Sequence, residues 1–119
     1  MQITIGKDTY DLNFGVRFVR ELDKVAGMKI NVQGVTQAFG MGLTVCLPSL
    51  QQYDPATLSD VLYCATWDNK KRPTRKMIDD YIDDDNTDII KLFDGVLNEM
   101  NKANAVKAAT SKMSKNTKA

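Results

Sequence analysis

The segment ITIGKDTYDLNFGVRFVRELDKVAG, residues 3–27, changes its hydrophobic period at Asn13. Before Asn13, apolar and polar residues alternate on both sides of a Gly-Lys-Asp turn, a pattern typical of a β-hairpin. After Asn13, apolar residues recur at spacings of three and four, which indicates an amphipathic helix. Asn13 is the expected N-cap of that helix and Gly27 its C-terminal stop. The change of period predicts a hairpin that leads into a helix.

The hairpin needs further packing, because an isolated two-stranded hairpin is only marginally stable in water. We expect its apolar side chains to pack on helices or to pair with the edge of another chain. These side chains are Ile3, Ile5, Tyr10 and Leu12. The apolar face of the following helix comprises Phe14, Phe18, Val19, Leu22, Val25 and Ala26.

A connector and a proline-containing helix are expected next. Residues 28–36 form the connector, in which residues 29–32 are a candidate for a short extended piece. The apolar segment 39–50 has a helical face made of Leu43, Leu47 and Leu50. Pro48 lacks an amide hydrogen and clashes with the carbonyl four residues before it. We therefore expect this helix to be short and to be kinked or broken near Pro48.

Three further helices are marked by residues at their starts. Asp54 and Pro55 are of the types favoured at the N-cap and first position of a helix, which should end near residues 67–69. Thr74 can cap a short helix, and Asp88 lies in the first turn of the last strongly periodic helix. The expected core positions of these helices are Leu58, Val61, Leu62, Ala65 and Thr66, then Met77, Ile78, Tyr81 and Ile82, then Ile89, Ile90, Phe93, Val96, Leu97 and Met100.

The predicted fold class is α+β and predominantly α-helical, with an N-terminal β-hairpin followed by about five helices. Residues 1–101 carry the apolar pattern of a single globular domain. Residues 102–119 contain five Lys, no acidic residue and mostly small or polar side chains. We expect the last helix to extend into this basic tail. The tail is partly helical or disordered, because it cannot bury enough apolar surface to fold alone.

Composition excludes most of the familiar hydrolase constellations. The chain has 119 residues, 16 Lys and Arg against 15 Asp and Glu, and no His. Without His it lacks the commonest general base and the commonest transition-metal ligand. Its sequence also shows no nucleophile–base arrangement, dinucleotide fingerprint or phosphate loop. We therefore expect no catalytic residue, no cofactor and no metal site.

Cys46 and Cys64 lie in apolar runs, which favours buried, reduced thiols over a redox or disulfide role. No segment approaches the ~20 apolar residues of a membrane span. Residues 1–5 lack the basic start and the long apolar centre of a signal peptide. The expected location is the cytosol.

Charge is segregated along the chain, although its net value is only +1. One basic cluster comprises Lys70, Lys71, Arg72, Arg75 and Lys76. A phosphate-binding patch is one interpretation of it, but a solvated loop and helix start is favoured, because only Trp67 lies nearby to stack on a base. The acidic run at 79–88, which includes Asp83, Asp84 and Asp85, lacks the Gly and Glu of a calcium loop, so solvated carboxylates are favoured over a cation site. Alternatively, the two runs pair across a subunit interface.

Four segments carry a family resemblance. They are ITIGKDTYDLNFGVRFVRELDKVAGM (3–28), FGMGLTVCLPSLQQYDPATLSDVLYCATW (39–67), RPTRKMIDDYIDD (72–84) and IIKLFDGVLNEM (89–100). In their order and spacing these segments resemble the tail assembly chaperones of long-tailed phages and prophages of Gram-positive bacteria. The resemblance covers residues 1 to about 100.

The resemblance implies a chaperone that coats the tape measure protein, keeps it soluble and recruits tail tube subunits. It implies similarity to the lambda-type pair, in which a shorter chaperone is accompanied by a frameshifted, C-terminally extended version. This chain looks like the shorter product, and the existence of a longer one is a hypothesis. The expected partners are the tape measure protein, the tail tube protein through the extended form, and further copies of the chain, without membrane or nucleic acid. Such a chaperone acts in the host bacterial cytoplasm and leaves before the virion is mature.

A chaperone of this kind needs an exposed apolar face rather than catalytic residues. The candidate partner-binding residues are Met28, Met41, Leu47, Leu50, Tyr53 and Trp67. Core packing is the alternative for each, and it is favoured for Leu47 and Leu50. Two other functions compete with the chaperone: a regulator that binds nucleic acid through residues 70–76, and a structural component that stays in the tail.

Overall fold

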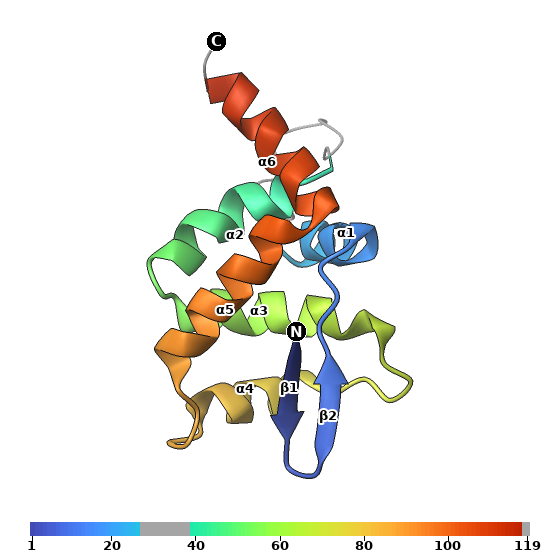
Figure 1. Cartoon of the computed structure of the whole chain (residues 1–119), viewed down its shortest axis with the longest axis vertical. Helices are drawn as coiled ribbons and strands as arrows, with labels where there is room; N and C mark the ends of the chain where they lie inside the picture. The colour runs from blue at the N-terminus through green and yellow to red at the C-terminus, as the bar shows by residue number, and fades with distance from the viewer. Residues whose placement is uncertain (27–38, 118–119) are drawn as a thin grey trace.

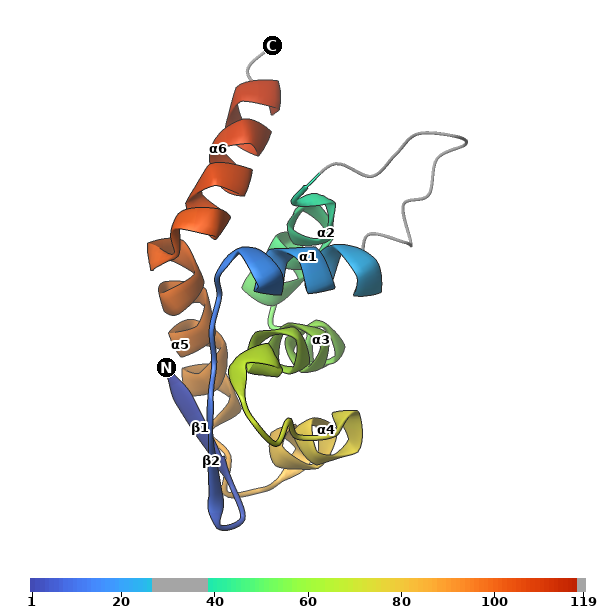
Figure 2. The same ribbon diagram turned by 90° about the vertical axis from the view of Figure 1, so that its right-hand side faces the viewer.

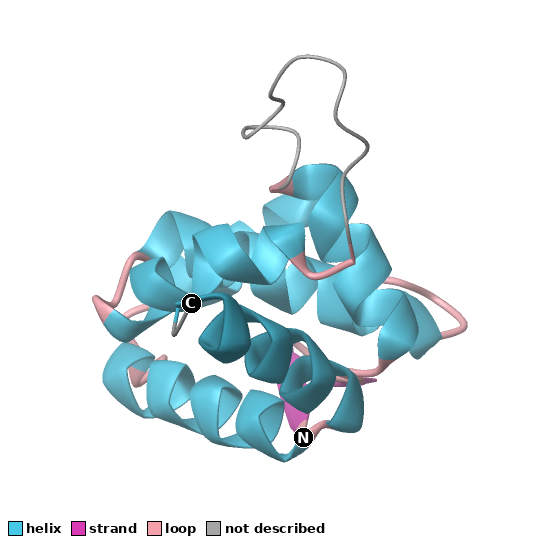
Figure 3. Cartoon of the chain, turned by 90° about the horizontal axis from the view of Figure 1, so that it is seen from above, coloured by secondary structure: helices cyan, strands magenta, loops and turns pink. Residues whose placement is uncertain are grey.

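The structure begins with a two-stranded hairpin that is followed by helices (Figure 1). This computed structural model describes residues 1–26 and 39–117, with side chains through residue 111. The elements are β1 (Gln2–Ile5), β2 (Asp8–Asp11), α1 (Val16–Val25), α2 (Met41–Gln51), α3 (Pro55–Ala65), the 3-10 helix η2 (Thr66–Asp68), α4 (Arg75–Asp83), α5 (Ile89–Lys102) and α6 (Asn104–Thr117). Within these described residues, Figure 3 shows helices over most of the chain and strands in the hairpin. The predicted α+β, predominantly helical class is confirmed.

The helices form two groups, a stack and a pair that runs beside it. In Figure 2, α1, α3 and α4 are stacked above one another, while α5 and α6 run along one side of the stack. The core lies between these groups, and its largest fully buried side chains include Phe18, Leu22, Leu43, Leu50, Leu58, Leu62, Ile78, Phe93 and Met100. These residues come from α1 to α5, so the core joins all five helices.

The predicted hairpin is present, and it packs on the helices. β1 and β2 are antiparallel, with Ile3 opposite Tyr10 and Thr4 opposite Thr9. Ile3 and Tyr10 belong to the core cluster, whereas the hydroxyls of Thr4 and Thr9 lie 3.1 Å apart on the exposed face. The turn is tight, and Gly6 has a φ of +64°, a conformation that glycine adopts without steric cost.

The start of α1 differs from the prediction. The helix begins at Val16 after an N-cap at Gly15, so the prediction of Asn13 as the N-cap is wrong. The Asn13 side chain instead accepts a hydrogen bond from the Gly15 amide at 3.0 Å, which forms a local turn before the helix. The predicted stop at Gly27 and the connector at 28–36 lie outside the described residues.

The α1–α2 contact depends on glycine. A Cβ atom on Gly42 would lie 2.5 Å from the carbonyl oxygen of Leu22, so only glycine lets the two helices approach this closely. Both oxygens of Asp23 accept amide hydrogens at the start of α2, from Gly40 at 3.1 Å and from Gly42 at 2.8 Å. α2 then continues through Pro48 to Gln51, so the predicted break at Pro48 is not observed.

The starts of α3, α4 and α5 follow the sequence signals. The Asp54 carboxylate accepts the Ala56 amide hydrogen at 3.0 Å with Pro55 at the first helical position, and the Thr74 hydroxyl accepts that of Met77. Asp88 is the N-cap of α5 rather than a residue of its first turn.

One predicted core position in α5 is wrong. Ile90 is 48% exposed, whereas Leu92, which the sequence pattern did not select, is only 7% exposed. Leu92 and Phe93 share the inward face of α5 with Val96 and Met100, because residues three and four apart lie on one side of a helix.

The segment after Lys102 forms α6, and its first half joins the core. Val106 and Ala109 are 1% and 4% exposed, and α6 contacts α1, α2 and α5. The far end of α6 projects beyond the other helices (Figure 2).

Candidate partner-binding site

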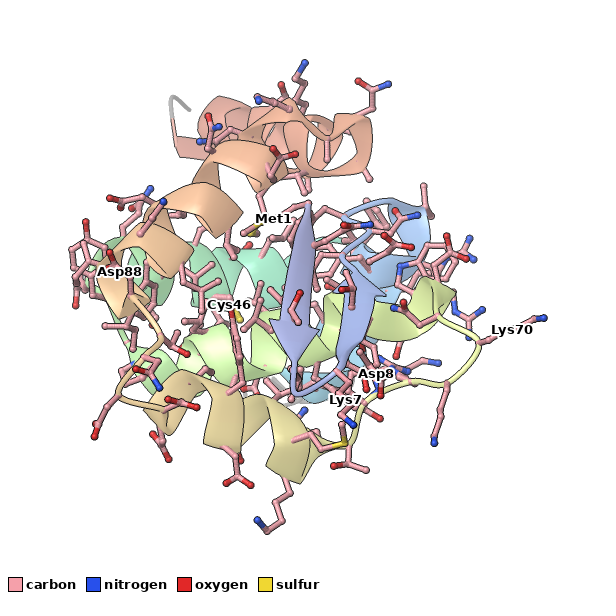
Figure 4. The ribbon with its side chains drawn as sticks, turned by 60° about the horizontal axis from the view of Figure 1, so that its bottom comes forward. Met1, Lys7, Asp8, Cys46, Lys70 and Asp88 are labelled. Atoms are coloured by element: carbon pink, nitrogen blue, oxygen red, sulfur yellow. The ribbon has the colours of Figure 1, made fainter. Side chains whose placement is uncertain are left out.

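An open groove lies between the hairpin and the helices α4 and α5. Its volume is about 610 Å³, and it is lined by residues of β1 and the hairpin turn, the end of α4, the loop at 84–88 and the first turns of α5. In Figure 4, Met1 lies at the start of β1 beside α5, and Asp88 lies at the start of α5. The groove therefore brings together two parts of the chain that are about 80 residues apart in the sequence.

The floor of the groove is apolar. Leu92 is almost fully buried, while Ile5 and Tyr81 are half-buried and pack against the core. Met1 is 38% exposed, and its terminal methyl lies over Gly95 of α5. Burial raises the pKa of the Tyr81 phenol above its usual value of 10.0, so this group is neutral at physiological pH.

The rim of the groove is acidic. Asp80, Asp84 and Asp88 line it, and Lys91 is the one basic residue among the described lining residues. Asp80 is paired with Lys76 at 2.7 Å, and this bond raises the pKa of the lysine. Asp84 accepts the Asn86 amide hydrogen at 2.9 Å, so it retains free acceptor capacity toward solvent.

The six predicted apolar contacts do not form one surface. Met28 lies outside the described residues, and Met41 is half-buried. Leu47 and Leu50 belong to the core, at 9% and 0% exposure. Tyr53 and Trp67 lie beyond opposite ends of α3, which separates them by roughly 16 Å.

Tyr53 and Trp67 are both held by polar contacts. Tyr53 is 42% exposed and donates its hydroxyl hydrogen to Asp94 at 2.9 Å, which raises the pKa of the phenol. Trp67 is half-buried and donates its indole N–H to the Asn13 carbonyl at 3.0 Å. Tyr53 is thus the most accessible of the predicted apolar contacts whose side chains are described.

Three residues of the predicted basic cluster have partners within the chain. Arg72 pairs with Glu21 at 2.9 Å, Arg75 pairs with Asp60, and Lys76 pairs with Asp80. The two remaining residues, Lys70 and Lys71, are exposed in the loop after η2, where Figure 4 shows Lys70 extending away from the ribbon.

The predicted acidic residues Asp83, Asp84 and Asp85 are all exposed, but only Asp84 lines the groove. Asp80, Asp88 and the apolar floor were not selected from the sequence. The acidic run was visible there, but its position opposite β1 depends on long-range packing that periodicity cannot reveal.

The described residues were also searched for metal ligands, exposed thiols and membrane-spanning helices. No group of three potential metal ligands is found among them. Cys64 is buried, and desolvation raises the pKa of its thiol to about 12. Cys46 is buried as well, as both cysteines were predicted to be. Within the same residues, no helix has the length and hydropathy needed to cross a bilayer.

The sequence was compared with known proteins and families. A family model described as phage tail assembly chaperone protein, TAC, matches residues 2–115. No curated protein and no solved structure matched the chain in the corresponding searches. The family match spans all of the described elements, from β1 through most of α6. The chain therefore belongs to the phage tail assembly chaperone family.

Proposed function

We propose that this chain binds the tape measure protein during tail assembly, keeps it soluble and helps to recruit tail tube subunits. The observation that carries the proposal is the family match over residues 2–115, which covers nearly the whole chain. The groove beside β1 supports it, because an apolar floor with a charged rim suits a peptide segment of a client. Recruitment of tube subunits would use a C-terminally extended form of the protein.

The proposal includes a location and an assembly state. The chain acts in the cytoplasm of the host bacterium, binds side by side with further copies on a long client, and departs before the tail is complete. A catalytic step has no place in this cycle, since solubilising a client requires only reversible burial of its apolar surface.

Inactivation of the gene tests the proposal in the phage. Cells that carry the inactivated gene should release no particles with complete tails, and the wild-type gene supplied in trans should restore them. Complete tails in the absence of the protein would contradict the proposal.

Mass spectrometry of purified particles separates a chaperone from a structural component. We expect the tape measure and tail tube proteins to be detected and this chain to be absent. A fixed number of copies per tail would instead identify it as a structural component. The nucleic-acid regulator receives less support, because Arg72, Arg75 and Lys76 of its predicted patch pair with carboxylates of the same chain.

A further inference from the structure

The groove contains an open strand edge. In an antiparallel pair, successive residues alternate between facing the partner strand and facing away from it. Asp11 faces away from β1, because its amide donates to Asn69 at 3.0 Å and its carbonyl accepts from Asn69 at 2.9 Å. Gln2 lies opposite Asp11, so the backbone groups of Gln2 face away from β2 on the other side of the hairpin.

The same alternation applies to Thr4, which is two residues further along β1. The Leu12 amide donates to the Met1 carbonyl at 2.9 Å, so Met1 faces the partner strand. This agrees with Gln2 and Thr4 facing away from β2. Within the described residues, no group from another element forms a backbone hydrogen bond with Gln2 or Thr4. Such an edge is a template for another strand, and here Thr4 and Ile5 line the groove directly.

The groove also sets the side-chain chemistry of a bound segment. A strand added to β1 would place alternate side chains over Ile5 and Leu92, where apolar groups are favoured. Residues at its other positions would share the exposed face of Thr4, from which long Lys or Arg side chains can bend toward Asp84 and Asp88 at the rim. β1 has four residues, so its open edge suits a segment of about the same length.

We propose that the groove binds an extended peptide segment in which apolar and basic residues alternate, and that this segment pairs with β1 as a third strand. The inference rests on the proposed function, in which that segment belongs to the client protein. Pairing with β1 would let the chaperone recognise segments of varied sequence, because backbone hydrogen bonds supply part of the affinity.

Peptide binding tests the inference without a known client. The probe is a fluorescent, acetylated octapeptide of alternating Lys and Val, and the control peptide replaces each Lys by Glu. We expect the Lys-Val peptide to bind the full chain at least about tenfold more tightly than the Glu-Val peptide at low salt. We also expect slower hydrogen exchange at the Gln2 and Thr4 amides when the peptide is bound. Equal binding of both peptides, or unchanged exchange at both amides, would overturn the inference.

Two proline variants test strand pairing. Thr4→Pro removes an amide hydrogen from the open edge of β1 but leaves the amides that face β2. Thr9→Pro is the matched control, because it acts on the outer edge of β2 and also removes the contact between the two hydroxyls. We expect Thr4→Pro to weaken peptide binding at least about tenfold and Thr9→Pro to leave it within about twofold. Equal affinities for the two variants, with both shown to be folded by circular dichroism, would contradict strand addition.

Charge variants test the rim. Asp84→Asn with Asp88→Asn removes two carboxylates from the groove, and Asn at these positions can still accept the amide hydrogens of Asn86 and Lys91. Asp83→Asn with Asp85→Asn changes the net charge equally at exposed positions outside the groove. We expect the first pair to weaken binding about fivefold or more and the second to have little effect. Equal weakening would attribute the effect to net charge alone and would overturn the proposed contact.

The same variants separate this inference from the proposed function. If wild type and Thr9→Pro solubilise the cognate tape measure protein but Thr4→Pro does not, both proposals are supported. If all three solubilise it, the client binds elsewhere, so the strand-pairing inference fails while the function stands. If wild type fails, the proposed function fails, and the peptide and exchange measurements still decide whether the groove binds a strand.

Discussion

At the scale of single residues, Arg72 joins three parts of the fold. Its guanidinium donates to the Tyr63 carbonyl at 2.8 Å and to the Thr66 hydroxyl at 3.1 Å, and it pairs with Glu21 of α1 at 2.9 Å. It also lies 4.1 Å from the centre of the Tyr63 ring. The planar fork of arginine can make these contacts together, whereas the single ammonium group of lysine cannot.

Arg72→Lys should therefore lower the free energy of unfolding by about 1–3 kcal/mol, because Thr66 and the Tyr63 carbonyl lose charge-assisted bonds. Urea denaturation followed by circular dichroism measures the change. Lys70→Ala is the control, since Lys70 is exposed and should shift the free energy by less than about 0.5 kcal/mol. If Arg72→Lys unfolded at the same urea concentration as the wild type, these bonds would contribute nothing to stability.

Gly42 lies at the close contact between α1 and α2. We expect Gly42→Ala to destabilise the fold by about 2 kcal/mol or more, because the new Cβ atom would lie 2.5 Å from the Leu22 carbonyl oxygen. Gly95→Ala is the matched control in another helix. Its new Cβ atom would meet only the end of the Met1 side chain at 3.2 Å, which can move aside, so alanine should be neutral or stabilising there. Similar losses for both variants would contradict the steric explanation.

Cys64 should be chemically protected in the folded protein. Desolvation raises its thiol pKa from 9.0 to about 12, so the folded state keeps a proton that the unfolded state loses above pH 9. This contribution to stability is complete below pH 9 and is lost as the pH rises toward 12. We expect iodoacetamide to leave Cys64 unmodified in the native protein at pH 8 and to alkylate it in guanidinium, as read by mass spectrometry. Rapid native alkylation would refute this account and revive a redox role.

At the scale of elements, local signals predicted the structure well. Asp54, Thr74 and Pro55 were assigned correctly to helix starts, because capping depends on residues within one turn. The errors arose where tertiary contacts override local preference. Asn13 has the right chemistry for an N-cap but is held before α1 by bonds to Ala65 and Trp67, which are more than 50 residues away.

The contribution of α6 to the core was the least visible in the sequence. Val106 is 1% exposed within a segment that otherwise has a polar, lysine-rich composition. We expect Val106→Ala to lower the free energy of unfolding by on the order of 2 kcal/mol, because the lost methyl groups leave a cavity among buried neighbours. Lys107→Ala changes the adjacent, exposed position and serves as the control in the same urea titration. An unchanged stability for Val106→Ala would mean that α6 is not docked in solution.

At the scale of the whole molecule, the groove results from contacts between distant segments. Residues 1–6 and 80–95 meet there, and each segment taken alone indicates only a strand or a helix. The sequence showed the acidic run and the hairpin but not their juxtaposition, so the predicted apolar contacts were assigned to other places. The predicted fold class and family needed only order and periodicity, whereas the groove depends on three-dimensional packing.

We propose that this chain keeps a tape measure protein soluble. Co-expression of this chain in bacteria with its cognate tape measure protein, followed by quantification of the tape measure protein in the soluble fraction, tests this proposal. We predict that most of it is soluble and co-purifies with this chain, and that it aggregates when expressed alone. Equal aggregation with and without this chain would contradict the claim.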